Sequence, residues 1–170
     1  IAAAQHVGVS PSVAAQALAR FENVKRRMEV RAKVALPATP DAEPVTLYDD
    51  FAHHPTAIRT TINGLRRTVG TARILAVFEP RSNTMKLGAM KAQLPWSLEE
   101  CDLAFCHTGG LDWDAREALS SMGARAQVAD TVDALAAQVV AQARPGDHIL
   151  CMSNGGFGGI HLKLVELLQK

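Results

Sequence analysis

The segment "YDDFAHHPTAI" crowds two adjacent carboxylates, Asp49 and Asp50, and two adjacent imidazoles, His53 and His54, into one turn. Helix capping explains one of these side chains, because a polar residue just before a proline can satisfy exposed amide groups of a first helical turn. A carboxylate at a strand end can instead bind a ribose diol, and imidazoles can stack on a base or donate to phosphate. A metal site is a third interpretation, although adjacent histidines rarely reach one ion together. Ligand binding explains most of the set.

A second polar segment, "EPRSNTMK", carries Glu79, Arg81, Ser82 and Asn83. The planar guanidinium of an arginine donates two parallel hydrogen bonds, which suits a carboxylate or a phosphate. The simpler alternative is that Arg81 forms an exposed pair with Glu79, a common and weak interaction. We treat the segment as a candidate binding loop for an anionic substrate.

A third segment, "SNGGFGGIH", places Asn154, Gly155 and Gly156 before an apolar helical pattern. Glycines let a ligand approach the backbone, and a following helix offers amides to an anion. The spacing fits neither GxGxxG nor the phosphate-loop pattern with its Lys-Ser/Thr, so it is weak as a nucleotide fingerprint. We expect a tight turn whose amides and Asn154 face a substrate, with simple strand-to-helix turning as the alternative.

The elements that must position these loops alternate along the chain. Apolar runs predict strands at 45–49, 73–79, 101–107, 124–129 and 147–153, and helical patterns lie at 55–69, 85–94, 112–122, 131–143 and 158–170. Such alternation is typical of a doubly wound α/β fold, with a mostly parallel, Rossmann-like sheet covered by helices on both faces. Ligands bind there beyond the carboxyl ends of the strands, so we expect the three polar loops and a fourth turn, at 107–110, to line one rim.

The N-terminal part reads differently. A helix remnant ends at Gly8, a second helix starts at the Ser10-Pro11 cap and runs to about residue 20, and "VKRRME" follows with Lys25, Arg26 and Arg27. These cations favour a helix dipole, and their place before a linker also lets them reach a cleft. "MEVRAKV" predicts a strand with Met28, Val30 and Ala32 on one face, and "ALPATPDAEP" predicts a loop or linker.

Composition limits the classes of function. The 170 residues are 48% hydrophobic, which is enough for a full hydrophobic core. The formal net charge of +1 does not indicate a nucleic-acid partner. The three cysteines lack a CxxC spacing and are predicted to be buried free thiols in a reducing compartment, the cytoplasm. No apolar run is long enough for a membrane span. Because the chain opens on Ile1 within a helical pattern, we expect a piece of a longer protein.

The motifs together resemble the Mur ligase family. "DDFAHHPTAI" is similar to its DD-(Y/F)-(G/A)-HHP segment, and "FENVKRRME" resembles the stretch that ends in arginine before its interdomain linker. More narrowly, "FEPRSNTMKLG" with "MSNGGFGGIHLKL" is similar to the members that join UDP-N-acetylmuramate to the murein tripeptide, L-alanyl-γ-D-glutamyl-meso-diaminopimelate. The resemblance covers nearly the whole chain.

The resemblance implies an ATP-dependent ligase of peptidoglycan recycling that activates the muramyl carboxylate as an acyl phosphate, with Mg²⁺ on the phosphates. It implies that Asp50 holds the nucleotide ribose, that Arg27 faces the ATP phosphates, and that both are catalytic. Asp49, His53 and His54 would shape the neighbouring nucleotide site. Tripeptide recognition would fall to Glu79, Arg81, Ser82, Asn83, Asn154, Gly155 and Gly156, and no metal ligand is expected in this chain.

The implied domain order is a tail of the central ATP-binding domain at 1–28, a strand and linker at 29–44, and the Mur ligase C-terminal domain at 45–170. The family's GTxGKT phosphate loop, its metal-binding glutamate and histidine, and its UDP-binding domain are not in this sequence. We therefore expect the chain to need the N-terminal and central domains for turnover. The alternatives are the C-terminal domain of the L-alanine-adding ligase and a non-enzymatic α/β ligand-binding domain.

Overall fold

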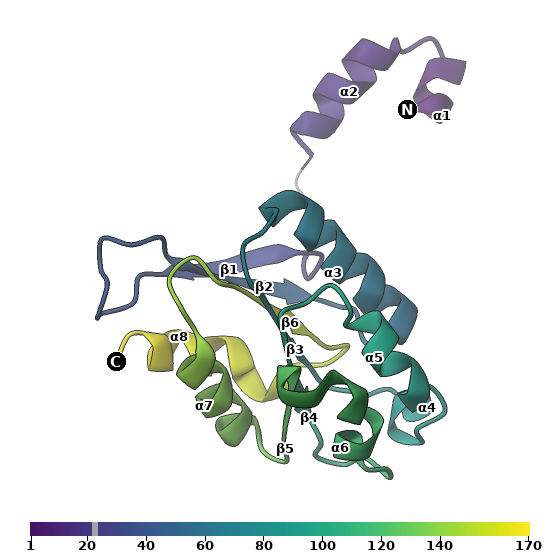
Figure 1. Ribbon diagram of the computed structural model, residues 1–170. Helices are drawn as coiled ribbons and strands as arrows, with labels where there is room; N and C mark the ends of the chain where they lie inside the picture. Colours follow the sequence, from purple (N-terminus) through teal and green to yellow (C-terminus); the bar gives the residue numbers. More distant parts are fainter. Residues whose placement is uncertain (22–23) are drawn as a thin grey trace.

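The computed structural model describes residues 1–21 and 24–170. The centre of this part is one six-stranded sheet, which Figure 1 shows with its surrounding helices. The strand order is β1-β2-β6-β3-β4-β5. β1 pairs antiparallel with β2 at one edge, and the other four pairings are parallel. The bounds are β1 Glu29–Val34, β2 Val45–Asp50, β3 Ile74–Phe78, β4 Leu103–His107, β5 Ala126–Ala129 and β6 His148–Met152.

Helices cover both faces of the sheet, which confirms the doubly wound α/β fold. α3 (Pro55–Val69), α4 (Asn83–Lys86), α5 (Leu94–Ser97) and α6 (Ala115–Ala118) pack on one face. α7 (Val132–Gln142) and α8 (Ile160–Leu168) pack on the other. Along β3 the side chains alternate between these two cores, so the whole strand is buried and reads as an unbroken apolar run.

The chain order explains where a ligand can bind. The path runs from β2 to β3, β4 and β5, and β6 then returns between β2 and β3. β2 and β3 lead to helices on one face, whereas β6 leads to α8 on the other. A crevice forms at such a reversal, beyond the carboxyl ends of the strands. The carboxyl ends of β2, β6 and β3 are neighbours there.

Two predicted helices are wrong in their extent. The pattern at 85–94 predicts one helix, but the chain forms α4, then a 3₁₀ turn at Lys91–Gln93, then α5. The helix stops because Gly88 takes a positive φ of 74°, which only glycine adopts at low cost. The helix at 112–122 is likewise reduced to α6 and a 3₁₀ segment, Ser120–Arg125, broken at Gly123.

β1 also departs from the expected pattern. Strict alternation places Val30 on the same face as Ala32, but Val30 is 51% exposed. The register shifts between these two residues, so a bulge interrupts the alternation. β1 is nevertheless a full member of the sheet, because Glu29 pairs opposite Asp49 and Val34 opposite Val45.

The N-terminal helices lie apart from the sheet in Figure 1. α1 spans Ala2–His6 and α2 spans Pro11–Ala19, where the Ser10 side chain accepts a hydrogen bond from the Val13 amide as expected of an N-cap. Within the described residues, no helix has the length and apolarity needed to cross a bilayer.

The three cysteines are free and buried, as predicted. Burial raises the pKa of Cys101 to about 12 and raises the pKa of Cys106 and of Cys151 well above their usual value. Thiols held in this protonated form pack as small apolar groups and are poor nucleophiles.

Candidate functional site

The three polar turns predicted from the sequence meet on one rim of the sheet. The Ser153 amide donates to the Asp50 carbonyl over 3.1 Å, and the Glu79 amide donates to the Met152 carbonyl over 3.3 Å. The Ser153 hydroxyl also donates to the Glu79 carboxylate. The ends of β2, β6 and β3 are therefore tied together directly by hydrogen bonds.

Asp50 ends β2 and is 3% exposed. One carboxylate oxygen accepts from the Ala52 amide at 2.8 Å and from the Thr61 hydroxyl at 3.2 Å. The other accepts from the Met28 amide at 2.9 Å. Three of the roughly four acceptor positions of a carboxylate are thus used within the chain, and one remains. Asp50 fixes the turn from β2 into α3 and the start of β1 in one place.

Arg26 is the main cross-link of the rim. Its guanidinium donates to the Asp49 carboxylate at 3.3 Å, to the Ser153 carbonyl at 2.5 Å and to the Gly155 carbonyl at 2.8 Å. His161, on α8, lies 3.6 Å from the same Asp49 carboxylate. Burial lowers the pKa of His161, and the charge of Asp49 opposes that effect. The cluster joins the β2 turn, the β6 loop and the segment before β1.

The backbone before β1 is bent to allow these contacts. Arg26 and Met28 both take positive φ values, 58° and 51°, a conformation that costs L-residues free energy. The Phe51 amide donates to the Arg26 carbonyl, and the Arg26 amide donates to the Glu29 carboxylate, both over 2.9 Å. Nothing local in "VKRRME" indicates these φ values, so the sequence alone did not single out Arg26.

Phe51 carries the aromatic part of the same rim. The guanidinium carbons of Arg26 and Arg27 each lie 5.4 Å from its ring centre, within cation–π range. His53 packs edge-on against Phe51 and makes a 3.0 Å hydrogen bond with its carbonyl. His54 is the N-cap residue of α3 and makes no side-chain capping bond. Arg26, Arg27 and His53 therefore gather around one partly exposed ring, and among the residues that the structure describes no such contact places His54 there.

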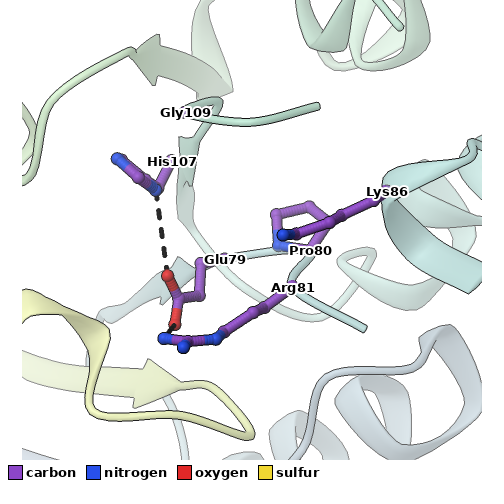
Figure 2. Close-up of a pocket in the computed structure, with 6 residues that line it drawn as sticks. All are labelled: Glu79, Pro80, Arg81, Lys86, His107 and Gly109. Carbon is purple, nitrogen blue, oxygen red and sulfur yellow. Dashed lines mark ion pairs between the residues drawn. The ribbon is translucent and has the colours of Figure 1, made fainter. Parts of the chain in front are cut away.

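A pocket of about 160 Å³ opens at the carboxyl ends of β3 and β4 (Figure 2). Inside it, the Glu79 carboxylate lies 3.7 Å from the Arg81 guanidinium and 3.8 Å from His107 Nδ1. The expected alternative, an Arg81–Glu79 pair, is therefore present, but Arg81 remains 53% exposed and can also reach a ligand. The lining consists of Glu79, Pro80, Arg81, Lys86, His107 and Gly109.

The remaining residues of these loops have more modest contacts. Ser82 caps α4 by accepting from the Met85 amide at 3.4 Å, and Asn83 is the exposed first residue of that helix. Asn154 is half-buried, and its side-chain oxygen is buried without a hydrogen-bond partner. Such an atom costs free energy unless a donor reaches it, and a bound ligand can be that donor.

Gly155 and Gly156 differ in what they allow. A Cβ built on Gly155 would lie 2.5 Å from the Arg81 Nη1 atom, so glycine here lets the Arg81 side chain lie against the β6 loop. A Cβ on Gly156 would meet nothing within 4 Å. Of the two, only Gly155 is in close contact with another residue, and a side chain there would displace Arg81.

Two further residues of the rim, Lys86 and His161, were not assigned a role from sequence. Arg26 was predicted only as one of three cations able to reach a cleft, and His107 only as part of a turn at the same edge. Lys86, His107 and His161 lie at or next to a helix or strand terminus, which is their main local signal, whereas Arg26 lies in the segment before β1. In the described part of the chain, no cluster of three or more His, Cys, Asp or Glu side chains is arranged to hold a metal ion.

Comparison with known proteins identifies the family. Residues 26–155 match the family model described as "Mur ligase, glutamate ligase domain". The chain belongs to the Mur ligase family. This Mur ligase chain is 52% identical over its full length to the UDP-N-acetylmuramate–L-alanyl-γ-D-glutamyl-meso-2,6-diaminoheptandioate ligase of Escherichia coli K12, and it spans 36% of that relative's length.

Two solved structures agree with this Mur ligase assignment. A domain from a putative UDP-N-acetylmuramate:L-alanyl-γ-D-glutamyl-diaminopimelate ligase of Haemophilus ducreyi superposes with a TM-score of 0.69 at 45% identity, covering 84% of this chain and 99% of that one. A murein peptide ligase from Psychrobacter arcticus gives a TM-score of 0.73 at 38% identity, covering 98% of this chain and 35% of that one. The Mur ligase chain therefore corresponds to about a third of the full-length relatives.

Proposed function

We propose that this chain is the C-terminal, substrate-binding domain of an ATP-dependent ligase that joins UDP-N-acetylmuramate to L-alanyl-γ-D-glutamyl-meso-diaminopimelate in the bacterial cytoplasm. The observation that carries the proposal is the 52% identity over the whole chain to a ligase named for those substrates. The rim supports it, because a pocket with a carboxylate, two cations and an imidazole suits a peptide that carries both charge signs.

The rim divides into two parts under this proposal. The peptide side is the pocket together with the β6 loop, where the exposed Arg81 can bind a carboxylate and Asn154 has an unused acceptor. It consists of Glu79, Arg81, Ser82, Asn83, Asn154, Gly155 and Gly156. The nucleotide side is the turn after β2 and the segment before β1. It consists of Arg27, Asp49, Asp50, His53 and His54.

The chemistry of the nucleotide side fits ATP. Arg27 can bind phosphate through its guanidinium. Phe51 is 37% exposed, so its ring can stack on a base. Asp50 has one acceptor position left for a ribose hydroxyl. ATP supplies the phosphoryl group that activates the muramyl carboxylate. The residues of this chain position the reactants, which is the main requirement of such a transfer.

Mg²⁺ fits this chain less well. The two carboxylates nearest the nucleotide side, Asp49 and Asp50, are 6% and 3% exposed and already hold Arg26 and three hydrogen-bond donors. We therefore place the Mg²⁺ ligands in the part of the ligase outside this chain. Residues 1–28 would be the tail of the central domain, 29–44 the first strand and linker, and 45–170 the C-terminal domain.

The experiment is a product assay on the full-length ligase with ATP and UDP-N-acetylmuramate. The expected result is ADP and amide product with the tripeptide, at a kcat/KM at least 100-fold above that with L-alanine. The isolated 170-residue chain should form neither product. No amide with the tripeptide, or equal use of L-alanine, would reject the proposed substrate.

A further inference from the structure

The Glu79 carboxylate has an oxygen that the fold leaves open. The side chain is 11% exposed, and one oxygen accepts from the Ser153 hydroxyl. The other oxygen faces His107 at 3.8 Å, which is too long for a hydrogen bond, and that atom opens into the pocket (Figure 2). A buried carboxylate of this kind is stabilised by a donor, and a cationic donor stabilises it most.

The spacing of the two groups suits one bridging nitrogen. The two atoms are 3.8 Å apart, so a nitrogen about 2.9 Å from both Glu79 Oε2 and His107 Nδ1 would form an Oε2···N···Nδ1 angle of about 80°. Two N–H bonds of one ammonium can donate at that angle. His107 is held for this role, since its ring lies 6.2 Å from the Phe157 ring. A Cβ at Gly109 would lie 2.8 Å from the ring, so the loop packs closely on it.

The two cationic side chains that line the pocket favour loss of a proton from such an ammonium. Arg81 and Lys86 lie across the pocket from His107 in Figure 2, and both are cations. Nearby positive charge disfavours a protonated amine and promotes loss of its proton. Glu79 attracts the ammonium and would stabilise the imidazolium formed when His107 takes the proton. The pocket thus holds an attracting carboxylate, a proton acceptor and two repelling cations.

We infer that this pocket binds the attacking amine of the incoming peptide and that His107 is the base that removes its proton. The inference rests on the proposed function. One ammonium N–H bond breaks and the His107 Nδ1–H bond forms. The freed lone pair then attacks the acyl carbon of the acyl phosphate. Phosphate leaves with the C–O bonding pair and takes the second N–H proton of the adduct, so the neutral amide and hydrogen phosphate are the products. His107 is the catalytic residue of this step, and Glu79 binds the ammonium.

The test uses the full-length ligase with His107→Gln, Glu79→Gln and a matched control, His148→Gln, at the opposite end of the sheet. Two reactions are compared: amide formation with the tripeptide, and acyl phosphate formation without it, trapped as hydroxamate by hydroxylamine. His107→Gln should lower kcat for amide formation about 10²- to 10⁴-fold and leave hydroxamate formation unchanged. Its amide formation should recover as pH rises through about 8, where a terminal amine loses its own proton.

Glu79→Gln keeps an oxygen for Ser153 but loses the charge, so the tripeptide KM should rise about tenfold or more while the ATP KM stays constant. His148→Gln should behave as wild type. If His107→Gln forms amide at the wild-type rate and pH dependence, or loses both reactions equally, the inference is overturned while the proposed function stands. If wild-type ligase makes no amide, the proposed function fails and the inference fails with it.

Discussion

Removing the Arg26 side chain should destabilise the domain more than any other surface arginine change on the rim. Arg26→Ala deletes hydrogen bonds to Asp49, Ser153 and Gly155, and leaves the carbonyl of the buried Ser153 without that donor. Each charged hydrogen bond contributes about 1.5–3 kcal/mol, but the three share one side chain that is 29% exposed and do not add fully. We expect a loss of about 3 kcal/mol in the free energy of unfolding.

Two controls separate the hydrogen bonds from other effects. Arg31→Ala removes one exposed ion pair with Glu29 and should cost at most about 0.5 kcal/mol. Arg26→Gly loses the same bonds as Arg26→Ala but relieves the positive φ, so it should be about 1 kcal/mol more stable than the alanine variant.

The assay is urea unfolding of the chain, followed by the fluorescence of Trp96 and Trp113. The dependence of the unfolding free energy on urea concentration is compared between variants to check that unfolding stays cooperative. Trp113 is informative because its indole nitrogen donates to the Met85 carbonyl beside the pocket. An exposed ion pair contributes about 0.5 kcal/mol. If the free energies of unfolding of Arg26→Ala and Arg31→Ala differ by less than that, the cross-linking role of Arg26 is wrong.

One further prediction concerns a glycine of the rim, and another concerns the pH dependence of stability. Gly155→Ala should push Arg81 away and raise the tripeptide KM of the full-length ligase about tenfold, by loss of one charged contact, whereas Gly156→Ala should have a much smaller effect; equal effects would contradict the close approach. Burial lowers the pKa of His161 and of His148 below 6.5, so the unfolded chain binds protons more readily and stability should fall as pH drops through 6.5 towards the folded pKa. Replacing both histidines by glutamine should flatten the stability profile between pH 5 and pH 7, and an unchanged slope would refute this assignment.

The strands and the fold class were predictable because each inner strand is buried on both faces. β3 and β6 read as continuous apolar runs for that reason, and Pro55 at the first position of α3 marks the start of the longest helix. The broken helix at 85–94 was not predictable from periodicity. Its apolar spacing is helical, and only the positive φ of Gly88 ends it.

The site was predictable as a location and less so in its members. Asp50 ends β2, while Glu79 and Asn154 follow β3 and β6, and the rule for parallel sheets places them on one edge. Arg26 and His107 act through contacts with residues far away in sequence, Arg26 with Ser153 and His107 with Glu79. No local pattern encodes such pairs, because the strand order that creates them is a property of the whole fold.

The division of the rim into a nucleotide side and a peptide side is tested most directly by steady-state kinetics of two variants of the full-length ligase. Arg81→Ala should raise the tripeptide KM and leave the ATP KM unchanged, while Asp50→Asn should do the reverse, with KM taken as an approximate guide to binding. Equal changes in both KM values for both variants would contradict the account.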